Sequence, residues 1–162
     1  MSGADRSSAS PTPPRRTDRV SDLPGAMEYH RTISIADLHA FCAATGDDNR
    51  IHLDISYAHA AGLAERIAHG TLIQGLMSTA CTRWAQREGL TILSGGWDRV
   101  RFIRPAVIGD TISVAYALQD PTDQGKRRLA TADAWNDRGE LVGIGTHILH
   151  VLTPGTSQAG AG

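Results

Sequence analysis

The sequence predicts an α+β domain in which one long helix packs on a curved antiparallel sheet. Apolar residues recur at helical spacing from about Gly70 to Arg87, and the pattern ends near Gly89. After that glycine the period changes to two, and short alternating segments follow one another to the end of the chain. Helix first and strands afterwards is the order typical of an α+β architecture. A length of 162 residues suits one domain with a substantial core.

The elements before the long helix follow from local signals. Residues 28–33 predict a first strand. Ser34 and Asp37 resemble a capping box, with Asp in the place of the usual Glu or Gln, and the apolar spacing that follows predicts a helix from Ile35 to Ala44 that stops at Gly46. Residues 56–63 predict a second short helix, closed near its glycine.

The strands after the long helix are separated by turn residues. Gly95-Gly96 indicates a bulge or turn, and two later turns are short enough for hairpins, which predicts an antiparallel meander. The predicted strands cover residues 91–93, 97–103, 111–118, 128–136 and 141–152.

The two ends of the chain differ in composition from the middle. Residues 1–26 are rich in Ser, Pro, Arg and Asp and predict a disordered tail, because they have too little apolar surface to offset the entropy of ordering. Residues 154–162 predict a flexible tail in the same way. The folded domain is therefore expected to span residues 27–153.

Composition excludes several classes of protein. Lys and Arg number 16 against 17 Asp and Glu, and aromatic residues make up 5%, so nothing indicates a nucleic-acid partner. No apolar run approaches the ~20 residues of a membrane span, and the N-terminus has no signal-peptide core. Cys42 and Cys81 fall in helical patterns and are expected to be free thiols. We expect a soluble, cytoplasmic protein that does not associate with membranes.

The loop from Gly46 to His52 carries the strongest chemical signal. Asp47 and His52 stand five residues apart and could hold one water molecule between them. Asn49 is expected to brace the loop backbone. Shortly afterwards Ala68-His69-Gly70 opens the long helix, whose free N–H groups could stabilise a developing oxyanion. On its own, the loop would be interpreted as a simple turn, since Asp, Asn and Gly are common turn residues.

Three segments in the right order resemble the MaoC-like hydratase/dehydratase family, which includes the (R)-specific enoyl-CoA hydratases. The family pattern G-D-x-N-P-[LIV]-H appears as residues 46–52, its helix start A-H-G-M-L as residues 68–72, and its late pattern R-F-x-x-P-x-x-x-G-D as residues 101–110. The resemblance implies the hot-dog fold, a long helix wrapped by an antiparallel sheet. Arg50 replaces the usual proline, and Thr71 replaces a commonly apolar residue.

The resemblance also implies a reaction and the residues that perform it. Asp47 and His52 would activate a water molecule, and the Gly70 N–H would stabilise the oxygen of an acyl thioester such as enoyl-CoA. Ser78 matches a family serine that hydrogen-bonds the catalytic Asp. No metal and no cofactor is implied, because coenzyme A or phosphopantetheine enters as the carrier of the substrate. A homodimer or higher homo-oligomer is implied as well.

Other interpretations are weighed on particular residues. A hot-dog thioesterase commonly has a carboxylate on the long helix, and residues 68–87 contain neither Asp nor Glu. A non-catalytic, acyl-binding subunit is suggested only by Arg50. His69 is expected to cap or orient the helix start, and His52, His59 and His69 lack the close spacing of a zinc site.

Overall fold

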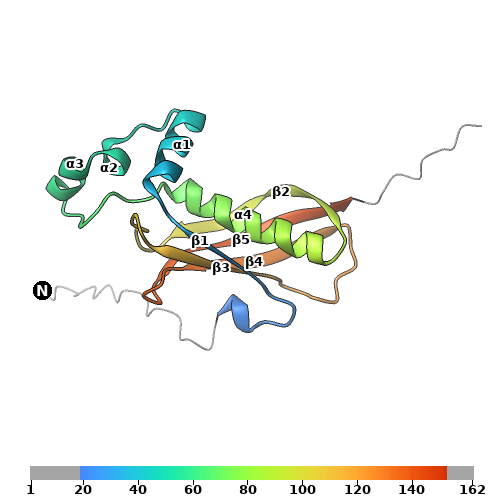
Figure 1. Ribbon diagram of the computed structural model, residues 1–162. Coiled ribbons are helices and arrows are strands. Elements are labelled where there is room, and N and C mark those ends of the chain that lie inside the picture. Colours follow the sequence, from blue (N-terminus) through green and yellow to red (C-terminus); the bar gives the residue numbers. More distant parts are fainter. Residues whose placement is uncertain (1–18, 153–162) are drawn as a thin grey trace, which may run out of the picture.

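The computed structural model describes residues 19–152. Residues 1–18 of the tail predicted at residues 1–26, and the whole tail predicted at residues 154–162, lie outside the described part. Its centre is a five-stranded antiparallel sheet in the order β1-β3-β4-β5-β2. A single 18-residue helix, α4 (Gly70–Arg87), lies across one face of this sheet (Figure 1). The predicted α+β architecture of a long helix on an antiparallel sheet is confirmed. The strands are β1 (Met27–Thr32), β2 (Thr91–Phe102), β3 (Thr111–Leu118), β4 (Arg127–Trp135) and β5 (Leu141–Leu152).

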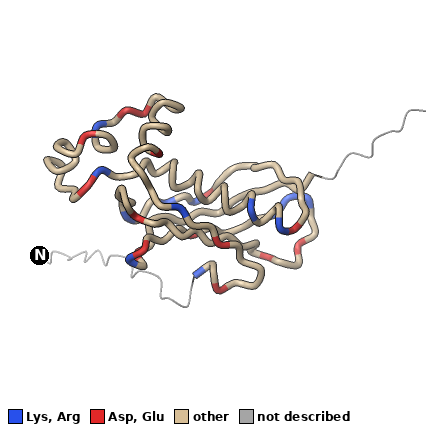
Figure 2. Tube along the Cα trace, in the orientation of Figure 1, with Lys and Arg blue, Asp and Glu red and all other residues tan. Residues whose placement is uncertain are grey.

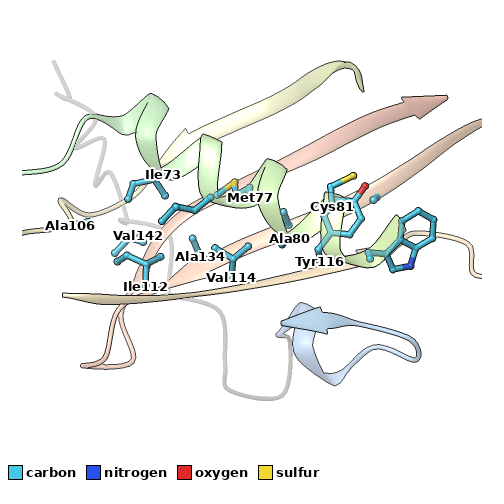
Figure 3. Packing of buried hydrophobic residues seen from close by; sticks show 14 of the residues in the cluster. Ile73, Met77, Ala80, Cys81, Ala106, Ile112, Val114, Tyr116, Ala134 and Val142 are labelled. Atoms are coloured by element: carbon cyan, nitrogen blue, oxygen red, sulfur yellow. The ribbon is translucent and has the colours of Figure 1, made fainter. Parts of the chain in front are cut away.

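The core lies between α4 and the sheet. Met77 and Ala80 on the helix are fully buried, and they face side chains from β3, β4 and β5 (Figure 3). Close approach is possible because small residues line the contact: a Cβ added at Gly143 would meet the Met77 methyl group at 3.0 Å. Truncating a buried side chain such as Met77 to Ala typically costs about 2–5 kcal/mol. The core therefore fixes α4, and with it the position of the helix N-terminus.

Three short helices stand beyond the N-terminal end of α4: α1 (Ile35–Thr45), α2 (Arg50–Leu53) and α3 (Ile55–Ala60) (Figure 1). The predicted capping box opens α1, because Asp37 N–H donates to Ser34 Oγ and Ser34 N–H donates to Asp37 Oδ2. The helix ends at Gly46, whose φ of 79° is in the left-handed region that favours glycine. This group of helices, α1–α3, is called the overhang below.

The structure differs from the prediction in three elements. Helix α2 was not predicted, since four residues are too few to show a period. Helix α3 covers Ile55–Ala60, whereas residues 56–63 were predicted. The two strands predicted at 91–93 and 97–103 form one strand, β2, interrupted by irregularities between Ser94 and Gly96 and between Asp98 and Arg101. The Gly95-Gly96 pair is thus a bulge, which is one of the two structures, bulge or turn, that were predicted for it.

Residues 19–26, which were predicted as part of a disordered tail, include a turn that packs on the sheet. Val20 lies in a 3-10 turn (Val20–Asp22), is 6% exposed, and packs with Ala115 and Ala117 in a second, smaller cluster. Its backbone N–H donates to Asp133 Oδ2 at 3.0 Å. The composition of this segment could not predict its packing, because the packing depends on one buried valine and on one hydrogen bond to the buried side chain of Asp133.

Charged residues of both signs are interspersed along the trace (Figure 2). The best-formed ion pair joins Asp110, which is 3% exposed, to Arg138 through two hydrogen bonds of 2.6 and 3.1 Å. Within residues 19–152, no helix combines the length and the apolar character that crossing a membrane requires.

Candidate active site

The site lies where the overhang meets the first turn of α4. Asp47 comes from the loop after α1, His52 from α2, and His69 is the N-cap of α4. One donor or acceptor atom from each of these side chains lies within 4.8 Å of those from the other two. The structure thus brings together the two side chains expected to share a water molecule, and it adds a third that was expected only to cap the helix.

The hydrogen bonds of His52 determine its tautomer. Its Nδ1 lies 2.8 Å from the carbonyl oxygen of Ile67. A carbonyl only accepts, so Nδ1 must carry the proton, and Nε2 of the neutral ring is left with a free lone pair. The residue is 9% exposed and lines a cavity of about 300 Å³. In this tautomer Nε2 of His52 can act as a hydrogen-bond acceptor and as a base, and the residue lines the cavity.

The same cavity reaches the N-terminus of α4. Gly70 is the first residue of the helix, and N–H groups in the first turn have no acceptor within the helix. The rest of the lining is largely apolar and includes Ile73, Phe102 and Val142. A Cβ added at Gly70 would lie 2.5 Å from two carbons of the Phe102 ring, so a side chain at this position would displace its neighbour. A cavity of this composition suits an apolar acyl group next to a polar reacting atom.

Asp47 is exposed, and it is not among the residues that line the cavity shared by His52 and Gly70. Its carboxylate has only a long contact within the described residues, 3.5 Å from the N–H of Asn49, and so remains available to a ligand or water. Its backbone carbonyl accepts a hydrogen bond from His69 Nε2 at 3.1 Å. The loop is thereby attached to the start of α4 through its main chain, which leaves the side chain free.

His69 is 2% exposed and lies between two rings. On one side the His52 ring is stacked against it, with centroids 3.7 Å apart and planes inclined by 27°, and on the other side the Phe41 centroid lies at 4.5 Å. Because Nε2 donates to a carbonyl, Nδ1 of the neutral ring is an acceptor, and it is buried with no partner in the described structure. A buried acceptor without a partner costs about 1–3 kcal/mol.

The predicted helix cap by His69 is not present, since its side chain makes no capping hydrogen bond. The sequence interpretation also missed its contact with His52, because sequence spacing does not show that residues 52 and 69 are neighbours in space. The three side chains are a possible donor set for a metal ion. However, the lone pairs of two nearly parallel stacked rings do not converge on one point, which favours hydrogen bonding over metal ligation.

The two supporting residues are in different situations. Asn49 is the N-cap of α2, where its Oδ1 accepts from the Ile51 N–H at 3.2 Å, so it organises the turn that carries His52. Ser78 is exposed on α4, and within one protomer no hydrogen bond joins it to Asp47 among the described residues. The hydrogen bond that the resemblance implied for Ser78 is therefore absent from the single protomer.

Arg50, the main departure from the family pattern, points away from the cavity. It is the first residue of α2, a position where proline is common because no N–H partner is lost. Its guanidinium contacts Asp54 at 2.6 Å and lies over the Tyr57 ring, within α2 and α3. It does not line the cavity that contains His52 and Gly70. The charge that replaces the proline is thus paired outside the site.

A second polar cluster lies in the core, where sequence analysis did not expect one. His147 is 1% exposed and bonded by both ring nitrogens, to Tyr116 Oη at 2.8 Å and to Ser94 Oγ at 2.9 Å. Burial lowers the pKa of His147 to about 4, so the ring is neutral at physiological pH. Ser94, His147 and Tyr116 are hydrogen-bonded in sequence, as in a catalytic triad, but the third member is a tyrosine. Among the described hydrogen-bond partners of His147 there is no carboxylate that could stabilise a buried imidazolium. The cluster is therefore a satisfied structural network.

The chain is similar to known hydratases and dehydratases. A 3-hydroxybutyryl-CoA dehydratase of Methylorubrum extorquens is 31% identical over 114 residues, which cover 70% of this chain and 71% of that protein. An (R)-specific enoyl-CoA hydratase of Rhodospirillum rubrum is 30% identical over 54% of this chain and 59% of its own length. The solved structure of the R-hydratase PhaJ1 from Pseudomonas aeruginosa superposes with a TM-score of 0.70 at 31% identity, covering 80% of this chain and 81% of that chain.

The model of the MaoC like domain matches residues 22–135, which include the motif loop, α4 and four of the five strands. The matched segment runs from the 3-10 turn to the end of β4, and it contains all the residues that line the cavity except Val142. The resemblance predicted from three short motifs is confirmed: the chain belongs to the MaoC-like domain family.

Proposed function

We propose that this chain is a hydratase/dehydratase, a carbon–oxygen lyase that adds water to, or removes it from, the α,β double bond of an acyl thioester such as an enoyl-CoA. The observation that carries the proposal is that His52 and Gly70 line one cavity, while a carboxylate oxygen of Asp47 lies within 4.8 Å of a ring nitrogen of His52. The activities named for the similar proteins support the same reaction class.

In the hydration direction the water oxygen attacks the β-carbon, while the electrons of the double bond move toward the thioester oxygen. Asp47 and His52 each accept a hydrogen bond from the water, and one of them takes a single proton as the oxygen bonds to the β-carbon. The other hydrogen stays on the new hydroxyl group, and the proton that was removed is delivered to the α-carbon. General acid–base assistance of this kind typically contributes ~10²–10⁴-fold in rate. The Gly70 N–H donates to the oxygen as its charge develops; one such donor is typically worth about 3 kcal/mol. Dehydration follows the same steps in reverse.

The carrier of the acyl group is coenzyme A or the phosphopantetheine of a carrier protein, and it enters as part of the substrate. We propose that catalysis uses no metal and no redox cofactor, since the three groups supply both the proton transfers and the oxyanion contact. Asn49 supports the loop by capping α2. Ser78 remains a proposed supporting residue.

We also propose that the chain is a homodimer or a higher homo-oligomer. Strand β2 is an edge of the sheet, 12 residues long, and long edge strands in soluble proteins are usually covered or paired. Leu93 on this strand is 58% exposed, and Phe102 and Ile103 at its end are each 49% exposed. Size-exclusion chromatography with light scattering tests this proposal, and a monomer at micromolar concentration would contradict it.

The function is tested by following the enoyl absorbance of crotonyl-CoA with the purified protein. Asp47→Asn and His52→Gln keep the size of each side chain and are expected to lose nearly all activity while remaining folded. His59→Gln is the matched control, because His59 is exposed on α3 and its ring contacts only the Ala64 carbonyl. Turnover close to wild type in both site variants would exclude the proposed mechanism.

A thioesterase activity is separated in the same experiment with a thiol reagent. Helix α4 has no carboxylate along its 18 residues. We therefore expect the enoyl absorbance to change without release of free coenzyme A. Thiol release at an unchanged double bond would identify the chain as a thioesterase.

A further inference from the structure

We propose that His69 is a positioning residue that holds the Asp47 loop and the His52 imidazole in the geometry that activates water. This inference rests on the proposed function, which it deepens by adding a residue to the same site. His69 contacts both groups, through its edge to the Asp47 carbonyl and through its face to the His52 ring. It also directly precedes Gly70 in the chain.

The three contacts of His69 come from different elements. Phe41 of α1 covers one face of the ring, His52 of α2 covers the other, and the Asp47 carbonyl accepts from Nε2. The ring is anchored at the start of α4, which the core holds in place. The contacts of His69 therefore fix the positions of the Asp47 loop and of α2 relative to the start of α4.

The tautomers of the two histidines are linked to this arrangement. His52 keeps its proton on Nδ1 as long as the Ile67 carbonyl stays at 2.8 Å, and only then is its Nε2 free to accept from water. The face of His69 stacks on the His52 ring with centroids 3.7 Å apart and so limits how far that ring can tilt. A rotation of the ring would break the hydrogen bond from Nδ1 to the Ile67 carbonyl, and with it the preference for the tautomer in which Nε2 is an acceptor.

The partnerless Nδ1 of His69 is the observation that a purely structural role leaves unexplained. A phenylalanine would fill the same space between Phe41 and His52 without burying a polar atom that lacks a partner. What phenylalanine cannot supply is the hydrogen bond from Nε2 to the Asp47 carbonyl. The unpaired Nδ1 is thus the cost of having a ring whose Nε2 donates to the Asp47 carbonyl.

The experiment compares His69→Phe, which keeps the ring and loses the donor, with His69→Gln, which keeps a donor amide at a similar reach. We expect His69→Phe to lower kcat for crotonyl-CoA hydration by roughly 10- to 100-fold with KM within about threefold, because misplacement of a catalytic group by about 1 Å has effects of this size. His69→Gln is expected to recover most of that loss. Leu38→Val, in the buried face of α1, is the control for destabilisation of the overhang.

Nitrogen-15 NMR of the histidine side chains provides a readout that does not depend on turnover. We expect His52 to be protonated on Nδ1 and His69 on Nε2 in the wild type. His52 should keep this tautomer in His69→Phe, which preserves the stacked ring, and its signals should indicate mixed tautomers in His69→Ala, which removes that ring. Wild-type kcat in His69→Phe, or an equal loss in Leu38→Val at the same melting temperature, overturns the proposal. A wild-type spectrum with His69 protonated on Nδ1 does so as well. If the wild type hydrates no enoyl thioester, the proposed function fails, and the spectra still decide whether His69 positions His52.

Discussion

Gly70→Ala is expected to reduce hydratase activity without reducing stability. The backbone of Gly70 is outside the left-handed region, so alanine fits the helix, and its higher helix propensity contributes up to about 1 kcal/mol. The new Cβ would lie 2.5 Å from the Phe102 ring, whereas ordinary contacts begin at 3.4 Å, so the ring must move by about 0.9 Å. Phe102 is 49% exposed and can move outward at small cost. The melting temperature should therefore change by no more than a few degrees.

The activity should fall because the methyl group occupies the space through which the thioester oxygen approaches the Gly70 N–H. Loss of one oxyanion donor costs about 3 kcal/mol, which corresponds to roughly a 100-fold decrease in kcat. The donor acts mainly in the transition state, so KM should change much less than kcat. Steady-state kinetics with crotonyl-CoA, together with thermal unfolding of the same preparation, measure both quantities.

A double variant separates the two possible causes of such a loss. Phe102→Ala removes the ring that a Cβ at residue 70 would contact. If the loss arises at the oxyanion, Gly70→Ala remains about 100-fold slower in the Phe102→Ala background. If Phe102→Ala restores the rate, the displaced ring was the cause. Activity of Gly70→Ala within threefold of wild type would refute the role of Gly70 altogether.

Three further substitutions test the stability of the domain. Asp110→Ala removes the acceptor of the Arg138 pair and of the Val107 N–H, and we expect about 2 kcal/mol less stability in urea unfolding; no change would show that the ion pair is idle. The pKa of His147 is lowered by burial to about 4, so the folded state binds fewer protons than the unfolded state between pH 4 and about 6.5. Stability is then complete above this window and decreases by up to about 3 kcal/mol as the pH falls through it, a slope that His147→Gln should abolish. Burial raises the pKa of Asp133, so the folded state keeps its proton to a higher pH than the unfolded state and stability falls as the pH rises above about 4. Asp133→Asn should therefore raise the melting temperature at pH 7 and leave it unchanged near pH 3.5, and a lower value at pH 7 would indicate an ionised, paired carboxylate.

Elements with a full period could be predicted from the sequence, and those that depend on packing could not. Helix α4 and strand β5 have the predicted bounds, because each shows several repeats of its hydrophobic period and ends at a glycine or turn. Helix α2 is a single turn held by its cap, and the turn at residues 20–22 is held by one valine and by Asp133. Neither contains enough residues for a periodic signal, so only tertiary contacts reveal them.

In the candidate site too, residues that lie in sequence motifs could be proposed from the sequence, whereas contacts that depend on tertiary packing could not. Asp47, His52 and Gly70 were proposed from the sequence because each lies in a motif with a chemical reason for its residue type, and their catalytic roles stay predictions. The position of His69 against His52 could not, since it depends on how the overhang folds back onto the start of α4. The Ser78 hydrogen bond, which came only from the resemblance, is absent within one protomer. A second copy is one place from which a partner for its exposed hydroxyl could come, and the oligomeric state therefore bears on this residue too.

The placement of the site has a consequence for how stability and activity respond to substitution. The main core lies between α4 and the sheet, while Asp47 and His52 are carried by a loop and a one-turn helix outside it. The start of α4, with His69 and Gly70, joins the two parts, and Leu38 of α1 also belongs to the core. Substitutions deep in the core, such as at Met77, should therefore lower the free energy of unfolding with little effect on kcat at temperatures where the protein remains folded. Substitutions at this joint should have the opposite effect, because a small displacement there separates the water-activating groups from the oxyanion donor while the core remains intact.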